Sequence, residues 1–444
     1  MPVSPARQLA FDVLTAVDEG GYAADLLHST WARGLALPDR RLATEIVMGV
    51  LRFRAQLDYV IERAARRTAA RIDTVALTAL RIGVYQLRFL SRVPASAAVH
   101  ESVEMTKANA PQLAGFVNAV LRHVSREPVA ALLAAEPDLK RRREVEFSHP
   151  AWLLERWSRN FSPEMAGRIA EFDNDVPPVA IRLTADAAEA ALPEDIVTAP
   201  GRLLRSALRV TAGDVTKTEA YRSGQVRVQD EASQLVAHLI EPGPRHRILD
   251  VCAAPGGKTA LLAALAPEAR VVAVEVHPQR ARLLRRRMPA TVHVVGADAT
   301  RPLPFRRGFD RILVDAPCTG TGTLARNPEI RWRLAPSDPV RLAALQMAIL
   351  RATVQALEPG GRLVYSVCSI EPEEGPGVIA ALLAANSELG IVPAGRVLDA
   401  LAAAGQLAED HPPLAAITAG PYLRILPGAA ATDGFFAAVI ERER

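Results

Sequence analysis

Two of the three cysteines each follow an apolar run that has the pattern of a β-strand. Cys318 ends the segment Asp315-Ala316-Pro317-Cys318, and Cys368 ends Val364-Tyr365-Ser366-Val367-Cys368. The thiolate is the nucleophilic form of cysteine, so a thiol beside a bound ligand is a candidate for covalent catalysis. The alternative, that each is a small buried hydrophobic residue, does not explain why both stand at the carboxyl end of a strand.

A glycine-rich turn lies earlier in the chain. The predicted strand 247–252 runs into Cys252-Ala253-Ala254-Pro255-Gly256-Gly257-Lys258-Thr259. A strand that opens into such a turn at a helix start lets backbone N–H groups approach a nucleotide-like ligand. The competing interpretation is a Walker A phosphate loop, whose last three residues match. However, Cys252 replaces the first glycine of that motif, and Pro255 lacks an N–H for phosphate, so the pattern disfavours a nucleoside triphosphatase.

An acidic residue stands at the end of each of three further predicted strands. These residues are Glu275, Asp298 and Asp315. Ligands of doubly wound sheets bind at the carboxyl ends of the strands, and an acid in the position of Glu275 holds ribose hydroxyls. Any one of these acids alone is more simply explained as a helix N-cap or a surface residue. The whole series, in phase with the glycine-rich turn, predicts a crevice that binds an adenosyl group.

Two thiols beside an adenosyl site suit the transfer of a methyl group to carbon 5 of cytosine. Carbon 5 is a poor nucleophile, but addition of a thiolate to carbon 6 makes it enamine-like and able to take a methyl group from a sulfonium donor. The C5 proton must then leave and the enzyme thiol must be eliminated, so a second acid–base group is useful. The sequence therefore predicts an enzyme that uses S-adenosyl-L-methionine.

Three parts of the chain differ in pattern. Residues 1–130 have apolar residues at helical spacing and predict an all-α module, in which Asp39 is expected to be an N-cap. Residues 145–225 mix amphipathic helix with β-like runs such as 179–183 and predict a small α+β module. Residues 226–444 alternate strands and helices, which predicts a Rossmann-like α/β domain with a mainly parallel sheet. The expected strands are 247–252, 270–276, 291–296, 310–315 and 362–368, the expected helices include 257–265, 278–288 and 339–357, and 422–426 with 435–440 is expected to close the sheet as an antiparallel pair.

The bulk composition limits the class of protein. A chain of 444 residues with 49% hydrophobic and 23% charged residues is typical of a globular protein with two or three domains. The net charge of +4 is compatible with an RNA partner without establishing one, and the nine arginines of 51–92 indicate either RNA contact or a solvated helix face. No apolar run reaches ~18 residues and no secretory leader is evident, so we expect a cytoplasmic protein without a membrane partner. The cysteine spacing predicts no metal site.

The motifs resemble those of the bacterial small-subunit (16S) rRNA cytosine-C5 methyltransferases of the RsmB (Sun/Fmu) class, within the NOL1/NOP2/Sun superfamily. The similarity runs nearly from end to end. In the catalytic part it lies in Gln229–Ser233, Leu249–Thr259, Asp315–Thr323 and Val364–Glu374. Residues 43–52 and 115–122 are similar to the NusB-like domain of that class, which separates this chain from the superfamily members that lack this domain.

The resemblance implies a role for each matching residue. It makes Cys368 the nucleophile, Cys318 the partner that assists product release, and Asp315 the group that faces N3 of the base. It implies further that the cofactor is bound by Cys252, Ala253, Ala254, Pro255, Gly256, Gly257, Lys258, Glu275, Asp298 and Asp315. The resemblance also implies an RNA-binding NusB-like module and ribosomal RNA as the partner. We expect the enzyme to be a monomer.

Two alternatives stay open. The same chemistry can act on transfer RNA, because RNA-reading surfaces have no short sequence code. The second alternative is a non-catalytic RNA-binding factor dominated by the NusB-like module. The intact Cys318 and Cys368 argue against this alternative. The chain departs from the family pattern at Asn327, where histidine is usual, and at Gly428, where the histidine of a Leu-Pro-His motif is usual. Both departures concern the substrate more than the reaction.

Overall fold

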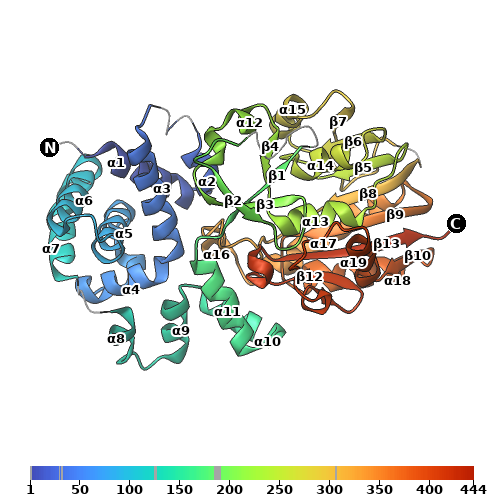
Figure 1. Cartoon of the computed structure of the whole chain (residues 1–444). Helices are drawn as coiled ribbons and strands as arrows, with labels where there is room; N and C mark the ends of the chain where they lie inside the picture. The colour runs from blue at the N-terminus through green and yellow to red at the C-terminus, as the bar shows by residue number, and fades with distance from the viewer. Residues whose placement is uncertain (1–2, 30, 32–33, 125–127, 185–191, 306–307) are drawn as a thin grey trace. The chain divides into compact units, whose positions relative to one another are not determined.

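The computed structural model describes residues 3–29, 31, 34–124, 128–184, 192–305 and 308–444, and the chain forms two compact units (Figure 1). The first unit comprises Met1–Val176 together with Leu324–Leu334. The second comprises Pro177–Thr323 and Ala335–Arg444. The chain thus leaves the second unit after Thr323, contributes a short segment to the first, and returns. Within the described ranges no helix is both long and apolar enough to cross a membrane.

The first unit is helical, as predicted for residues 1–130, and it also includes the helices up to Val176, of which those after residue 145 were predicted to lie in the small α+β module. Its helices are α1 (Pro5–Asp18), α2 (Ala23–Leu27), α3 (Leu37–Arg52), α4 (Arg54–Ala65), α5 (Thr74–Phe89), α6 (Ala95–Asn109), α7 (Ala114–His123), α8 (Val129–Leu133), α9 (Leu139–Phe147), α10 (Ala151–Asn160), α11 (Pro163–Asn174) and α16 (Ile330–Arg333). Apolar residues at helical spacing on α1, α3 and α5 form its core. The prediction that Asp39 caps a helix is wrong: α3 begins at Leu37 with Ala36 as N-cap, because Pro38 fits the first turn of a helix.

The second unit contains a small antiparallel sheet and a large mixed sheet. The small sheet has the order β2-β3-β1-β4, formed by β1 (Val179–Leu183), β2 (Val197–Pro200), β3 (Ala207–Ala212) and β4 (Val226–Val228), with α12 (Glu219–Arg222) beside it. The predicted strand 179–183 is confirmed. Ile181, Val215, Ala220 and Val226 form a small core of their own.

The large sheet has nine strands in the order β11-β12-β13-β9-β8-β5-β6-β7, with β10 paired to β13. The strands are β5 (Arg247–Val251), β6 (Arg270–Glu275), β7 (Val292–Gly296), β8 (Phe309–Asp315), β9 (Leu357–Val367), β10 (Leu389–Val392), β11 (Thr418–Ala419), β12 (Tyr422–Ile425) and β13 (Phe435–Arg442). All five predicted parallel strands and the antiparallel pair β12–β13 are confirmed. The sheet is mixed rather than mainly parallel, because β13 pairs antiparallel with β9, and β10 and β11 extend this part.

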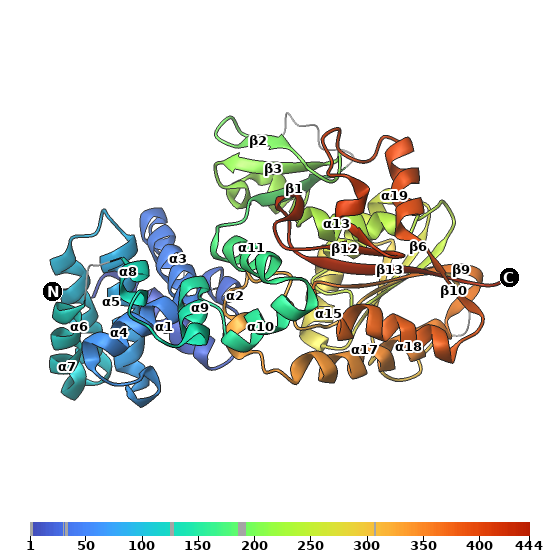
Figure 2. The same cartoon turned by 90° about the horizontal axis from the view of Figure 1, so that it is seen from below.

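Helices cover both faces of the large sheet (Figure 2). The helices are α13 (Glu231–Leu239), α14 (Gly257–Leu265), α15 (Pro278–Arg287), α17 (Asp338–Val354), α18 (Val378–Ala385) and α19 (Ala394–Ala403). Neighbouring strand residues enter different cores: Ile248 packs with α13, α14 and α19, whereas Leu249 packs with α17 and α18. The strand order reverses direction at β5 and β8, and the crevice outside the carboxyl ends of such strands is where sheets of this type bind ligands.

Candidate active site

The glycine-rich turn joins the end of β5 to the start of α14. Cys252 and Gly256 both have positive φ, 62° and 105°, and α14 begins at Gly257. A Cβ on Gly256 would lie 2.5 Å from the Leu284 side chain and 2.8 Å from that of Met288. Glycine is therefore required at 256 for backbone conformation and for close packing against α15. The turn presents the N-terminus of a nine-residue helix to the crevice.

The buried carboxyl of Asp250 holds the two ends of the turn together. Asp250 of β5 is fully buried, and its Oδ2 accepts a hydrogen bond of 2.6 Å from Thr259 Oγ1 on α14. Burial raises the pKa of Asp250 to about 7, and the hydrogen bond from Thr259 opposes that rise. Strand and helix are thus tied together beneath the turn.

Glu275 and Asp298 occupy different surroundings. Glu275, at the end of β6, is 5% exposed and accepts hydrogen bonds from the backbone N–H of Ala254 in the turn and of His277. Asp298 accepts from the backbone N–H and the hydroxyl of Thr300, and its side chain is 43% exposed. Glu275 therefore belongs to the turn, while the carboxylate of Asp298 also organises its own loop.

The carboxylates act together on the thiol of Cys252. Burial is the main cause that raises the pKa of Cys252 to about 12, and the charges of Asp315, Glu275, Asp250 and Asp298 follow, in that order. The turn therefore lies in a negative electrostatic field. Such a field repels phosphate and attracts a cation, so the crevice suits a sulfonium group better than a nucleoside triphosphate.

The two strand-end thiols are neighbours in space. Cys318 Sγ and Cys368 Sγ lie 3.4 Å apart, and both side chains are half-buried. The hydrogen bond to Cys368, followed by burial, raises the pKa of Cys318 well above its usual value. The raised pKa favours the protonated form of Cys318, and either sulfur can be the donor of the hydrogen bond between them. The loop after Cys318 packs against the Cys368 loop, where Gly322 N–H donates to Cys368 O at 3.0 Å.

Asp315 joins the cofactor turn to the thiols. Lys258 Nζ of the turn donates to Asp315 Oδ2 at 2.8 Å, and Ser366 Oγ of β9 donates to Asp315 Oδ1 at 2.9 Å. The Lys258 ammonium also lies 5.0 Å from the centre of the Phe435 ring. One carboxylate thus links three strand ends, with a proton donor on each of its oxygens.

Sequence reasoning missed a buried acid beneath the thiols. Glu374 is fully buried, and Thr319 N–H, Ser369 Oγ and Gln346 Nε2 donate to its carboxylate at 2.9, 2.5 and 3.0 Å. The Thr319 hydroxyl also donates to it. Burial raises its pKa, and these hydrogen bonds oppose the rise. Because Thr319 and Ser369 directly follow the two cysteines, Glu374 fixes the spacing of the two thiol loops.

The described part of the chain holds no group of three or more His, Cys, Asp or Glu side chains arranged for a metal ion. The residues that the structure brings together are those of the turn, Glu275, Asp315 and the two thiols. Asp298 stands at the rim, where it reaches the turn through its charge.

The glycine-rich turn, the strand order and the paired helical layers define a Rossmann-like methyltransferase domain, which the first unit accompanies as a helical module. Comparison with known families identifies both. The family described as 16S rRNA methyltransferase RsmB/F matches residues 237–441, and the NusB family matches residues 4–126. The ribosomal RNA small subunit methyltransferase B of Sodalis glossinidius (strain morsitans) is 35% identical over 97% of this chain and 96% of that protein. The enzyme of the same name from Vibrio cholerae serotype O1 is 36% identical over 91% of this chain and 90% of that protein.

The chain therefore belongs to the RsmB/F family of 16S rRNA methyltransferases, as its motifs predict. Among solved structures, PH0851 has the same fold over the full length of both chains, with a TM-score of 0.83 and 22% identity. A methyltransferase homolog from Pyrococcus horikoshii matches 68% of this chain and 98% of its own, with a TM-score of 0.54 and 25% identity.

Proposed function

We propose that the protein methylates carbon 5 of a cytosine in 16S ribosomal RNA with S-adenosyl-L-methionine, through a covalent bond between Cys368 and carbon 6. The observation that carries this proposal is the 3.4 Å pair of thiols beside Asp315 and the glycine-rich turn. The ribosomal target follows the names of the relatives, which span the whole chain.

The residues of the turn fit S-adenosyl-L-methionine. Cys252, Ala253, Ala254, Pro255, Gly256, Gly257 and Lys258 supply the backbone of the turn, and Glu275, Asp298 and Asp315 supply carboxylates. Glu275 at the end of β6 suits the ribose hydroxyls, and the field of the carboxylates favours the sulfonium charge. When bound, the cofactor supplies an electrophilic methyl group.

Cys368 acts as the nucleophile, and Cys318, whose raised pKa favours its protonated form, lies 3.4 Å from its sulfur. The Cys368 thiolate bonds to C6, and the C5–C6 π electrons become available at C5. Asp315 passes a proton from the Lys258 ammonium, which donates to its Oδ2, to N3 on addition and returns it to Lys258 on elimination. The ring thus stays neutral while carbon 5 becomes nucleophilic.

Cys318 becomes the base only after addition. After addition the sulfur of Cys368 is a neutral thioether, which accepts hydrogen bonds only weakly. The Cys318 thiol then gives its proton to water, and its thiolate takes the proton from C5. The C5–H electron pair re-forms the C5–C6 double bond and expels Cys368 as a thiolate.

Single cysteine variants test the roles of the two thiols. We expect Cys368→Ser to lower methyl transfer to 16S rRNA by about 10³-fold or more, because it removes the attacking group. Cys318→Ala keeps addition but blocks elimination, so a protein–RNA adduct should survive on a denaturing gel. The double variant is the control and should give no adduct. Full activity of Cys368→Ser would refute the mechanism.

Bisulfite mapping of ribosomal and transfer RNA from cells with and without the protein tests the target. We expect one lost 5-methylcytosine in 16S rRNA. Loss of 5-methylcytosine only from transfer RNA would overturn the assignment to ribosomal RNA, but it would still support methylation of cytosine at carbon 5. No lost mark in either RNA, with no methyl transfer in vitro, would favour the non-catalytic NusB-like RNA-binding factor.

A further inference from the structure

A pocket of about 410 Å³ lies in the second unit, away from the thiols. Its polar lining comprises Arg182, Arg205, Ser206, His238 and Gln406, and its apolar wall includes Leu261 and Leu265 of α14. The helix α14 begins in the cofactor turn at Gly257; Leu261 stands at its middle and Leu265 at its last residue. None of the residues that line the pocket belongs to the turn or to the two thiol loops. The pocket is therefore separate from the catalytic crevice.

Arg182 of β1 is a buried cation without an acidic partner among the described residues. Arg182 is 3% exposed, and neither its Nε nor its Nη2 has a hydrogen-bond partner among the described residues. Arg227 of β4 pairs directly with it across the sheet. Burial, followed by the charge of Arg227, lowers the pKa of Arg182 to about 10. A buried, unpaired guanidinium is costly, and an anion in the pocket would offset that cost.

His238 brings an unused acceptor to the same pocket. It is 7% exposed, and its Nδ1 lies 3.1 Å from Gln406 Oε1. A carbonyl oxygen only accepts, so Nδ1 carries the proton and the neutral ring has a lone pair on Nε2. Burial lowers the pKa of His238, which keeps the ring neutral. Nε2 has no partner among the described residues, so it can accept a hydrogen bond from a ligand hydroxyl.

The rim of the pocket can adapt to a ligand. Arg205 pairs with Glu409 at 3.3 Å, and their side chains are 61% and 85% exposed. Exposed pairs of this kind are weak, so Arg205 is available to a second phosphate oxygen. The apolar wall from α14 offers a surface for a planar base.

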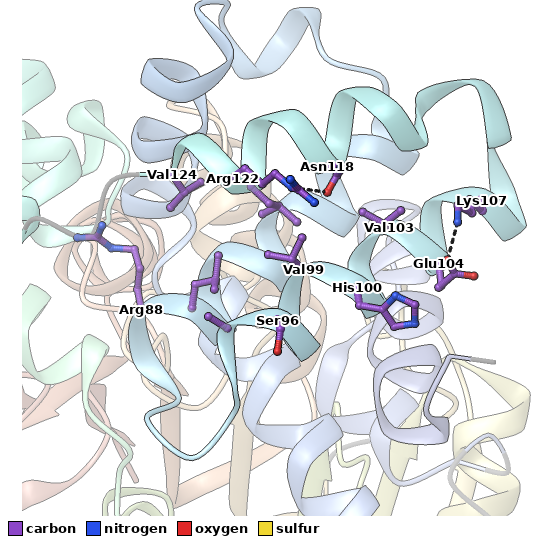
Figure 3. Close-up of a pocket in the computed structure, with 13 residues that line it drawn as sticks. Arg88, Ser96, Val99, His100, Val103, Glu104, Lys107, Asn118, Arg122 and Val124 are labelled. Atoms are coloured by element: carbon purple, nitrogen blue, oxygen red, sulfur yellow. Dashed lines mark hydrogen bonds and ion pairs between the residues drawn. The ribbon is translucent and has the colours of Figure 1, made fainter. Parts of the chain in front are cut away.

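A second pocket lies in the first unit, and there two of the cationic side chains already have hydrogen-bond partners (Figure 3). It has a volume of about 580 Å³ and lies among α5, α6 and α7. Two of its cationic side chains already have partners within the pocket: Lys107 donates to Glu104 at 2.7 Å, and Arg122 donates to Asn118 at 3.2 Å. The pocket on α14 is therefore the stronger candidate for an anionic ligand.

We propose that the pocket formed by β1, α13 and the end of α14 binds a ribonucleotide of the RNA substrate outside the methylated base. Arg182 takes the phosphate, His238 Nε2 accepts a hydrogen bond from a ribose hydroxyl, and the base lies against Leu261 and Leu265. The assignment to substrate RNA rests on the proposed function. The pocket itself rests on Arg182 and His238 alone.

Binding measurements on the full chain test this proposal without any methyl transfer, so they stand apart from the test of Cys368. The probes are cytidine 5′-monophosphate, its 2′-deoxy form, and a single-stranded RNA of about ten nucleotides. We expect Arg182→Met to lower the affinity for the ribonucleotide and for the RNA by about tenfold or more, because a charge-assisted contact is lost. The salt dependence of RNA binding should fall by about one phosphate contact. The control Arg209→Met, on the neighbouring strand β3 and outside the pocket, should bind like the wild type.

Stability and sugar preference give independent readouts. Because Nε and Nη2 of Arg182 have no hydrogen-bond partner among the described residues, Arg182→Met should melt at the same temperature as the wild type or higher. His238→Phe leaves Arg182 in place and should abolish the preference for the ribonucleotide over its deoxy form. Weaker binding of the mononucleotide with unchanged RNA binding would overturn the assignment to substrate RNA and identify a free nucleotide as the ligand. Equal affinities of Arg182→Met and Arg209→Met for every probe would overturn the proposal.

Discussion

Arg331 is the residue whose loss should most damage the first unit. It lies in the segment Leu324–Leu334, and its guanidinium is fully buried. Its nitrogens donate to the backbone carbonyls of Ser148, Asp173 and Leu324 and to the side chain of Asn174, at distances of 2.8 to 3.2 Å. One side chain therefore joins the segment to the helices around it.

The change Arg331→Ala leaves these buried acceptors without a donor. It also removes the charge that faces the buried Asp173, whose pKa burial raises to about 7. Removing one partner of a buried charge network costs about 3–5 kcal/mol. That is a large share of the roughly 5–15 kcal/mol that stabilises a typical domain. For a unit of this size it corresponds to a melting temperature lower by about 6–20 °C.

Calorimetry of the full chain measures this change as a shift in the transition of the first unit. Arg331→Lys keeps the positive charge but not the planar guanidinium with its several N–H donors, so we expect it to lower the melting temperature by an intermediate amount. Arg341→Ala is the matched control, because this arginine is 67% exposed and pairs with Asp338 on α17. It should shift stability by less than about 0.5 kcal/mol. A melting curve of Arg331→Ala that overlays that of the control would refute the reasoning.

Two further predictions concern the cofactor turn. Gly256→Ala should weaken S-adenosyl-L-methionine binding by about tenfold or more, measured by calorimetric titration, because a Cβ collides with α15 at a positive φ. Asp250 has a pKa of about 7 when folded against 3.8 when exposed, so its contribution to stability is present below about pH 4 and is lost as the pH rises to about 7. Asp250→Asn should remove this part of the pH dependence of the melting temperature, and an unchanged profile would contradict it.

The central parallel strands β5 and β6 can be predicted from sequence because most of their residues on both faces are buried. Each appears as a mainly apolar run, and the predicted bounds agree with the observed ones to within one residue. The short edge strands β10 and β11 carry no such run, and their pairing with β13 and β12 is a tertiary effect. The N-cap of α3 was misplaced because Asp39 is a common capping residue that here lies inside the first turn.

The candidate site was predictable where strand ends mark it and not where contacts are long-range. The distance between Cys318 and Cys368 follows from the adjacency of β8 and β9, which sequence order alone does not give. Glu374 ends the motif segment Val364–Glu374, but its position between the thiol loops depends on Thr319, which is 55 residues away. Arg182 stands in a strand where alternation makes it look solvent-facing, although it is buried. Side-chain burial of this kind depends on what packs above the strand.

The position of Arg331 in the chain links the stability of the first unit to catalysis. Gly322 binds the backbone of Cys368, and only Thr323 separates it from Leu324, whose carbonyl accepts from Arg331. If the first unit only tethers RNA, Arg331→Ala raises KM for RNA and leaves kcat unchanged. If the anchor holds the loop that fixes Cys368, kcat falls as well, and Arg331→Lys restores part of it.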